Sequence, residues 1–334
     1  MNIKHFMNTM CQSTVKKALP ILSFPSVQLL DITVRDLISS ADFQAKGMKT
    51  IADRLDSAAS VSMMDLSVEA EAFGATVRFS ENEVPTVTGA LITDEDDAEQ
   101  LEVPAVGAGR TGLYIEAIRN ACTLIQDRPV FAGVIGPYSL AGRLLDVSEI
   151  MVLCYEEPDM VHTVLRKATD FLIQYIKAYR DVGANGVVVA EPLAGLLSPS
   201  LMEEFSAPYM KEIVDAVQTE EFAVIYHNCG NAVPMLTEEI VSCGAMAYHF
   251  GNAVSMKTML EQMPSDVPVM GNIDPVGELC NGTPDSVYQK TTSLLQECSV
   301  FPNFVISTGC DVPPMAKWEN INAFFRAVSD FYTK

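Results

Sequence analysis

The sequence is poor in basic residues and has no long apolar run. It contains 22 lysines and arginines against 43 aspartates and glutamates, for a formal net charge of -21. A surface of this sign repels the phosphates of nucleic acids and anionic lipid head groups. We therefore expect neither nucleic acid nor a membrane as a partner.

No apolar stretch approaches the roughly 18 to 20 residues that a membrane-spanning helix needs. The segment from Met1 to Leu19 contains three lysines and no hydrophobic core of a signal peptide. These absences predict a cytoplasmic protein. The eight cysteines are scattered through 334 residues and do not suggest a disulfide framework, so a reducing compartment would leave their thiols free to bind metal.

Eight short apolar runs are predicted as buried strands, and amphipathic helical patterns separate most of them. The runs are Pro20–Pro25, Val61–Leu66, Pro129–Ile135, Gly186–Ala190, Phe222–Tyr226, Ala245–His249, Val267–Met270 and Phe304–Ile306. Eight such units in a chain of this length favour an α/β fold of the closed (β/α)₈ TIM barrel type, preceded by a helical segment. The amino-acid composition does not change along the chain in the way that marks a second domain, so residues 1–334 are predicted to form one barrel domain.

Two other segments receive specific predictions. The stretch Thr33–Ala59 is predicted as helix, and Phe73–Phe79 with Thr86–Leu91 as a hairpin or excursion from the barrel. Polar residues follow the carboxyl ends of successive strands, the face where barrel enzymes carry their active sites. These residues are Asp65, Tyr138, Glu191, His227, Cys229, His249, Asn272, Asp274 and Cys310.

Three of them form the candidate metal site. His227 and Cys229 are two residues apart, so their side chains point the same way on an extended backbone. Cys310 follows the last predicted strand and reaches the same mouth. One imidazole and two thiolates suit a catalytic zinc site with an open position. The alternative is that these are ordinary buried residues, since a buried cysteine often serves only as a small hydrophobe.

The chain resembles the uroporphyrinogen decarboxylase superfamily, and within it the zinc-dependent cobalamin methyltransferases. The resemblance covers nearly the whole chain. Its most specific motifs are His227-Asn228-Cys229-Gly230-Asn231 and Gly309-Cys310-Asp311-Val312-Pro313-Pro314, supported by Asp65-Leu66-Ser67-Val68-Glu69-Ala70, Gly136-Pro137-Tyr138 and Gly271-Asn272-Ile273-Asp274-Pro275.

The resemblance implies Zn²⁺ on His227, Cys229 and Cys310, and a barrel mouth that receives methylcobalamin or the corrinoid of a corrinoid protein. A small-molecule thiol then accepts the methyl group. Glu191 is a candidate fourth ligand or a residue that supports the ligands.

Further roles follow from the same resemblance. Asp65 and Asn272 are candidates to bind corrinoid or substrate amides, with a capping or turn role as the alternative. Tyr138 is a candidate to flank the cofactor plane, with ordinary packing as the alternative. His249 is either a hydrogen-bond donor behind the metal ligands or a core histidine, and Asp274 is predicted as a turn residue.

Three alternatives remain open from the sequence. The enzyme can run the other half-reaction, from a methylated substrate to a corrinoid protein. It can be a uroporphyrinogen decarboxylase-like lyase, although Phe24-Pro25-Ser26-Val27-Gln28 lacks that enzyme's arginines and Arg143 stands where it has a tyrosine. It can also bind zinc or corrinoid without catalysis.

Overall fold

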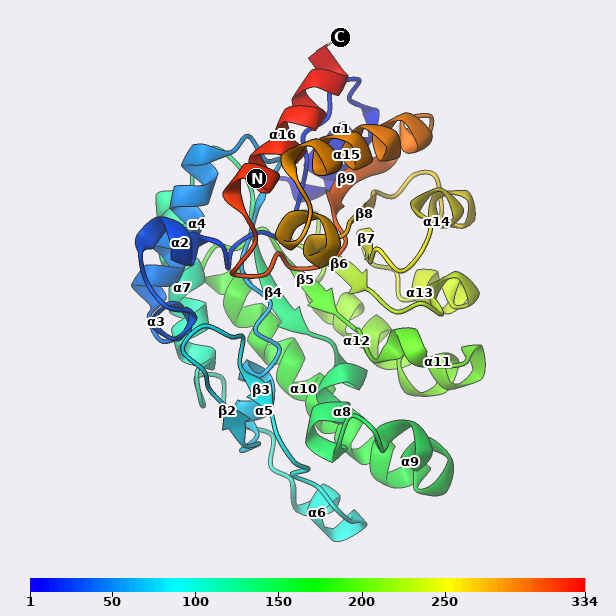
Figure 1. The fold of residues 1–334 in the computed structure, drawn as a ribbon. Helices are drawn as coiled ribbons and strands as arrows, with labels where there is room; N and C mark the ends of the chain where they lie inside the picture. Colours follow the sequence, from blue (N-terminus) through cyan, green and yellow to red (C-terminus); the bar gives the residue numbers. More distant parts are fainter. Residues whose placement is uncertain (334) are drawn as a thin grey trace.

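The computed structural model describes residues 1–333, which build one curled parallel sheet surrounded by helices (Figure 1). The sheet runs in the order β1-β4-β5-β6-β7-β8-β9, and every neighbouring pair is parallel. Its strands are β1 (Ser60–Val61), β4 (Val130–Ile135), β5 (Gly186–Ala190), β6 (Ala223–Asn228), β7 (Ala247–Phe250), β8 (Val269–Ile273) and β9 (Phe304–Thr308). Apolar strands alternating with amphipathic helices produce this arrangement, because both faces of such a sheet must be covered.

The helices lie on the outside of the curled sheet, with α1 at one end of it (Figure 1). Before β4 they are α1 (Ile3–Gln12), α2 (Ser26–Leu30), α3 (Val34–Ile38), α4 (Ala41–Arg54), α5 (Val68–Ala72), α6 (Glu95–Gln100) and α7 (Thr111–Leu124). Between β4 and β6 they are α8 (Pro137–Leu145), α9 (Ile150–Glu156), α10 (Pro158–Asp181), the 3₁₀-helix η1 (Ala194–Leu196), α11 (Pro199–Phe205) and α12 (Ala207–Val217). After β6 they are the 3₁₀-helix η2 (Val233–Met235), α13 (Thr237–Ser242), α14 (Met256–Gln262), the π-helix η3 (Pro275–Cys280), α15 (Pro284–Cys298) and α16 (Trp318–Thr333). No helix of residues 1–333 combines the length and the apolarity needed to cross a membrane.

The sheet interior is packed with side chains. Successive strands contribute one buried cluster, and Met7 of α1 joins it. The inward members include Phe131, Val188, Ile225, Met270 and Val305. A filled interior leaves the strand ends as the place where a ligand can enter.

The first predicted strand, Pro20–Pro25, is not found. The preceding residues do contact both edges of the sheet: the Leu19 amide donates to the Ile306 carbonyl at 3.0 Å, and the Ala58 amide donates to the Ala18 carbonyl at 2.8 Å. Pro20 has no amide hydrogen, and the Ile21 amide donates to the Thr308 hydroxyl, so no ladder develops. The sheet of residues 1–333 therefore has seven strands, one fewer than predicted.

Two further predictions are refined. The hairpin is present as β2 (Val77–Arg78) paired antiparallel with β3 (Thr86–Val87). The stretch Thr33–Ala59 divides into α3 and α4, because the Ser40 hydroxyl accepts from the Phe43 amide and starts a new helix.

Candidate metal centre

His227, Cys229 and Cys310 come together at the carboxyl ends of β6 and β9. His227 lies within β6, Cys229 follows that strand directly, and Cys310 lies two residues beyond β9. Their Nδ1 or Nε2 and Sγ atoms all lie within 4.8 Å of one another, and Nε2 of His227 is 3.5 Å from Sγ of Cys310. In residues 1–333 this is the one group of three or more His, Cys, Asp or Glu side chains close enough to share a metal ion.

The two thiols influence each other's ionisation. Contact with Cys310 and His227 lowers the pKa of Cys229, although burial opposes this effect. Contact with Cys229, together with burial, raises the pKa of Cys310. One thiol of the pair is therefore prepared to be a thiolate, the form that binds metal.

His227 is oriented by a second histidine on β7. The two residues pair in the strand register, and Nδ1 of His249 lies 2.8 Å from Nδ1 of His227. Nε2 of His249 lies 2.8 Å from the Ser307 hydroxyl. Burial, followed by the charge of His227, lowers the pKa of His249, so this ring is neutral. If the Ser307 hydroxyl accepts a hydrogen bond from Nε2–H of His249, then Nδ1 of His249 accepts one from Nδ1–H of His227. The lone pair on Nε2 of His227 then points to the cysteines.

This donor set fits zinc. One imidazole nitrogen and two sulfurs are the ligand types that Zn²⁺ prefers, and three protein ligands leave a position for substrate. The lowered pKa of Cys229 and the neutral His249 behind His227 both favour the metal-binding forms of the ligands.

The Glu191 carboxylate, predicted as a fourth ligand, lies outside this cluster. It accepts from the Tyr138 amide at 2.9 Å, the Ser139 amide at 3.0 Å and the Ser139 hydroxyl at 2.7 Å. Gly136 leaves room for it, because a Cβ there would lie 2.3 Å from the Glu191 carboxyl group. The Glu191 backbone amide donates to the His227 carbonyl at 2.8 Å, so the backbone of Glu191 stabilises the end of β6.

Glu69 is a second buried carboxylate near the mouth; it lies in the motif Asp65-Leu66-Ser67-Val68-Glu69-Ala70, but no role was predicted for it. Oε1 accepts from the Ile135 amide at 3.1 Å, while Oε2 is buried without a hydrogen-bond partner. Burial raises the pKa of Glu69 from 4.5 to about 7. Such a group lowers stability as pH rises, because the unfolded chain releases the proton first.

We predict that Glu69→Gln stabilises the protein at pH 8 but not at pH 4.5. The penalty of the ionised side chain is absent below the unfolded pKa, grows between pH 4.5 and about 7, and reaches about 3 kcal/mol above that range. Urea unfolding of both proteins at the two pH values measures the difference. An equal effect of the substitution at both pH values would contradict this assignment.

Asp65 follows β1 and is engaged inside the protein. One carboxylate oxygen accepts from the Ser67 amide and hydroxyl, and the other from the Tyr114 hydroxyl and the Arg110 guanidinium. Arg110 also donates to Glu71 at 2.6 Å. Arg110 and Tyr114 lie 45 and 49 residues from Asp65 in sequence, so no local pattern predicted this network.

The structure places the other predicted residues in supporting positions. Tyr138 is fully buried, with its hydroxyl 3.7 Å from Sγ of Cys154. The side-chain amide of Asn272 donates through Nδ2 to the Gly251 and Val254 carbonyls at 2.9 and 2.8 Å, which fixes the loop after β7. Asp274 accepts from the Val276 and Gly277 amides, the predicted turn role. The contributions of Tyr138 and Asn272 to cofactor binding stay predictions.

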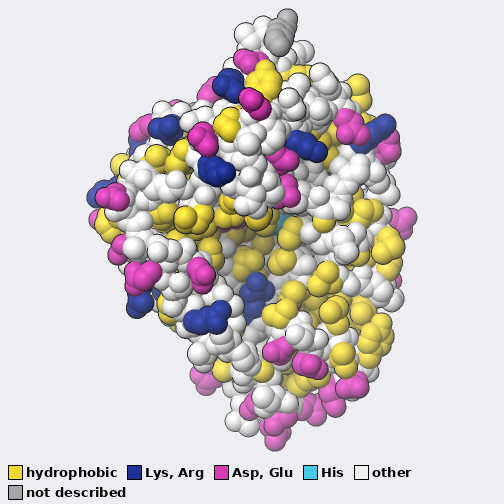
Figure 2. All heavy atoms as spheres, in the orientation of Figure 1, with side chains coloured by type: hydrophobic (Ala, Val, Ile, Leu, Met, Phe, Trp, Pro, Cys, Tyr) yellow, Lys and Arg dark blue, Asp and Glu magenta, His cyan; other side chains and the backbone are white. Residues whose placement is uncertain are grey.

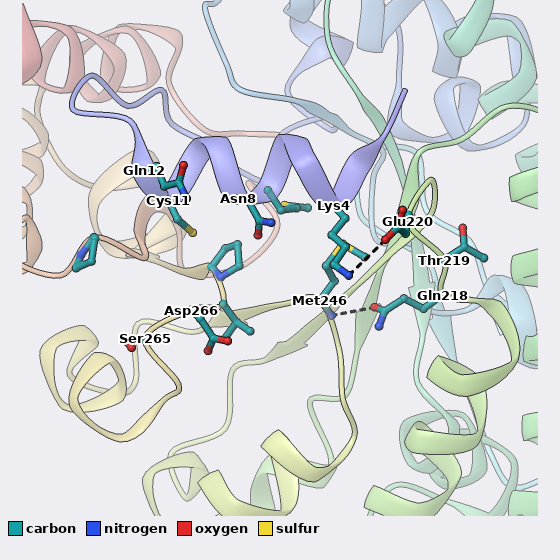
Figure 3. Close-up of a pocket in the computed structure, with 14 residues that line it drawn as sticks. Lys4, Asn8, Cys11, Gln12, Gln218, Thr219, Glu220, Met246, Ser265 and Asp266 are labelled. Carbon is teal, nitrogen blue, oxygen red and sulfur yellow. Dashed lines mark hydrogen bonds and ion pairs between the residues drawn. The ribbon is translucent and has the colours of Figure 1, made fainter.

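Two cavities lie at opposite ends of the strands. A cavity of about 390 Å³ is lined by residues that follow β1, by the β3 hairpin and by the end of α8. The face drawn in Figure 2 is hollowed near its centre, where hydrophobic and basic side chains border the opening and histidine atoms are visible. A larger cavity of about 790 Å³ lies between α1 and the loops that precede β6 to β9 (Figure 3). Lys4 pairs with Glu220 at its edge, and none of the predicted site residues lines it.

The family profile described as Uroporphyrinogen decarboxylase (URO-D) matches residues 26–331. The chain belongs to the uroporphyrinogen decarboxylase family. The match extends from α2 to α16 and so includes all three residues of the candidate metal centre.

Several known proteins are similar to the chain over most of its length. The methylcobamide:CoM methyltransferase MtbA of Methanosarcina acetivorans is 27% identical over 271 residues, which cover 80% of this chain and 78% of that protein. The methylated-thiol–coenzyme M methyltransferase of Methanosarcina mazei is 26% identical over 80% of this chain and 71% of its own length. A uroporphyrinogen decarboxylase of Hydrogenovibrio crunogenus is 24% identical, covering 83% and 79%.

Solved structures show the same fold. A methyltransferase from Methanosarcina mazei superposes with a TM-score of 0.86 over 99% of both chains at 23% identity. A B12-independent methionine synthase from Shewanella has a TM-score of 0.59 at 12% identity, covering 95% of this chain and 93% of that one. The curled parallel sheet is therefore shared with both structures.

Proposed function

We propose that the protein is a zinc-dependent methyltransferase that moves a methyl group from a methylated corrinoid to a thiol. The observation that carries this proposal is the grouping of His227, Cys229 and Cys310 within 4.8 Å at the carboxyl ends of the strands. The relatives support it, since two of them are named as coenzyme M methyltransferases.

His227, Cys229 and Cys310 would hold the metal. When bound, zinc supplies a Lewis acid that keeps a substrate thiol in its thiolate form near neutral pH. His249 and Ser307 orient the His227 ring, and Glu191 braces the end of β6 through its backbone. The filled sheet interior leaves the strand ends as the approach for both substrates.

The reaction needs a nucleophile and no general acid. The substrate thiolate attacks the methyl carbon, a carbon–sulfur bond forms, and the carbon–cobalt bond breaks. The electron pair of the broken carbon–cobalt bond stays on cobalt, so the products are cob(I)alamin and a thioether. The proton of the thiol is released to solvent when the thiolate forms. Corrinoid protein and small thiol are thus the proposed partners.

We infer further that residues 1–334 form one domain. We also infer that the segment around Leu19, which is hydrogen-bonded on both sides, takes the place of an eighth strand and closes the barrel. A closed barrel would bring the ends of β9 and β1 near each other, on either side of this segment, as the hydrogen bond from the Met64 amide to Asp311 at 2.7 Å supports.

The test of function is the absorption spectrum of methylcobalamin mixed with zinc-loaded protein and a panel of thiols. Conversion of methylcobalamin to cob(I)alamin that requires both the protein and a thiol supports the proposed direction. Conversion in the reverse sense alone, from cob(I)alamin and a methylated thioether, indicates the other half-reaction. No conversion in either sense, with decarboxylation of uroporphyrinogen instead, would replace the proposal with a lyase.

We predict that His249→Phe weakens zinc binding by about tenfold to a hundredfold, the range found when a partner behind a ligand is removed. Phenylalanine fills the space but cannot accept a hydrogen bond from Nδ1 of His227. Chelator competition measures the zinc affinity. His162→Phe is the matched control, because His162 lies on α10, stacks on Phe205 of α11 and is outside the metal cluster. Equal affinities in His249→Phe and the parent would contradict the orienting role.

A further inference from the structure

The two cysteines of the metal centre follow strands that are not neighbours. Cys229 comes directly after β6 and Cys310 comes after β9, and β7 and β8 lie between these strands in the sheet. Each strand is hydrogen-bonded only to its neighbours in the sheet, so the register by itself does not fix how far apart the two thiols lie. The residues that separate the two cysteines belong to the loop after β7, residues 251–254, called here the β7 loop.

The β7 loop packs closely against both of the turns that carry the thiols. A Cβ at Gly251 would lie 2.6 Å from both Cα and Cβ of Cys229, so the backbone of the loop contacts this ligand directly. A Cβ at Gly309 would lie 2.6 Å from the backbone nitrogen of Asn252, so the loop also contacts the residue before Cys310. A glycine at each contact permits an approach that a larger side chain would prevent. The position of the β7 loop therefore affects both cysteines.

One side chain holds the β7 loop at both of its ends. Nδ2 of Asn272, on β8, donates to the Gly251 carbonyl at 2.9 Å and to the Val254 carbonyl at 2.8 Å. Within residues 1–333 no other side chain forms a hydrogen bond with this loop. An asparagine amide has two N–H donors, and the loop takes up both of them. Nδ2 of Asn272 therefore has no hydrogen left to donate to corrinoid or substrate.

The distance between the two sulfurs decides whether they can share a zinc ion. Zinc–sulfur bonds are about 2.3 Å long and the sites are tetrahedral, so the two sulfurs must lie about 3.8 Å apart. A binding site loses affinity when its geometry departs from the required one by more than about 0.5 Å. A loop that holds the two thiols at the right separation before the metal binds therefore strengthens binding.

We propose that Asn272 is a positioning residue, which sets the separation of Cys229 and Cys310 by fixing the β7 loop between them. This inference rests on the metal centre of the proposed function, and it does not depend on methyl transfer. Asn272 thus acts through the loop and touches neither the metal nor the substrates. Gly251 belongs to the same arrangement, because it lets the loop backbone contact Cys229.

The experiment compares Asn272→Leu with Asn303→Leu. Leucine is similar in size to asparagine but donates no hydrogen bond. Nδ2 of Asn303 donates to the Pro264 and Val267 carbonyls at 3.1 and 3.0 Å, at the amino ends of β8 and β9, so this control loses the same two bonds far from the metal centre. We expect Asn272→Leu to weaken zinc binding about tenfold to a hundredfold in chelator competition. Asn303→Leu should leave zinc binding unchanged.

Two further measurements distinguish a change of geometry from a loss of stability. The absorption spectrum of the cobalt(II)-substituted protein reports its sulfur ligands and their tetrahedral arrangement, and it should change in Asn272→Leu but not in Asn303→Leu. Phenylarsine oxide reacts with two adjacent thiols without zinc: two arsenic–sulfur bonds form, and the arsenic-bound oxygen leaves as water with both thiol protons. Its binding to the metal-free protein should weaken in Asn272→Leu and be lost in Cys310→Ser.

Gly251→Ala tests the same contact without removing a hydrogen bond. The added methyl group would collide with Cys229, so this variant should also weaken zinc binding and alter the cobalt spectrum, although Asn272 is intact. It provides the test if Asn272→Leu does not fold.

The outcomes separate this inference from the proposed function. Unchanged zinc affinity and an unchanged cobalt spectrum in Asn272→Leu and Gly251→Ala would overturn the positioning role, even if the parent protein transfers methyl groups. Equal changes in Asn272→Leu and Asn303→Leu would also overturn it. The expected pattern in a protein that transfers no methyl group to any thiol would keep the positioning role and reject the methyltransferase. A parent protein that binds neither zinc nor phenylarsine oxide would overturn both.

Discussion

Cys310→Ser is expected to lower bound zinc from about one ion per chain to less than about 0.2. The serine hydroxyl is a much poorer zinc ligand than a thiolate, so His227 and Cys229 would remain as a two-ligand site. The loss should persist after reconstitution with zinc under reducing conditions. Metal analysis of protein purified without added metal, before and after reconstitution, measures it.

Cys280→Ser is the matched control for that experiment. Cys280 lies in η3, is partly buried like Cys310, and is outside the metal cluster. The same exchange of sulfur for oxygen there should leave the zinc content unchanged. Full zinc in Cys310→Ser, or equal losses in both variants, would remove Cys310 from the set of ligands.

Asp65→Asn is expected to lower the free energy of unfolding by about 3 kcal/mol. The Asp65 side chain is fully buried and Arg110 is nearly so, and breaking a buried ion pair leaves the remaining charge without its partner. Asparagine preserves the shape and the hydrogen bond with Tyr114 but not the charge. Urea unfolding at neutral pH gives the difference.

Asp127→Asn provides the comparison for the buried pair. Asp127 pairs with Arg128 at 2.7 Å, but 64% of its side chain is exposed, so its loss should cost less than about 1 kcal/mol. If Asp65→Asn costs no more than Asp127→Asn and instead weakens corrinoid binding, the ion pair is incidental. The binding role predicted from the sequence would then be the better description of Asp65.

The sequence predicted the strands well where local pattern determines them. The run from Gly186 to Ala190 is apolar throughout and is buried on both faces, and the structure has the same bounds. The prediction was wrong for Pro20–Pro25, because a proline and side-chain hydrogen bonding prevent a ladder there. Apolar composition indicates burial, whereas ladder formation depends on which backbone groups are free to pair.

The grouping of the three candidate metal ligands was predictable because it follows from the topology. Residues at the carboxyl ends of parallel strands meet at the same face of the sheet, so the sequence alone predicted that His227, Cys229 and Cys310 lie close together. The surroundings of these residues were not predictable in the same way. The engagement of Glu191 by the start of α8 depends on how individual side chains pack, as does the pairing of Asp65 with Arg110.

X-ray absorption at the zinc edge, recorded with and without a small thiol, tests the central claim most directly. The zinc-loaded protein should show two sulfur ligands and one imidazole nitrogen, contributed by Cys229, Cys310 and His227. Adding the thiol should raise the count to three sulfurs, because the substrate enters the open position. An unchanged sulfur count, or zinc surrounded only by nitrogen and oxygen, would contradict the proposed role of this centre.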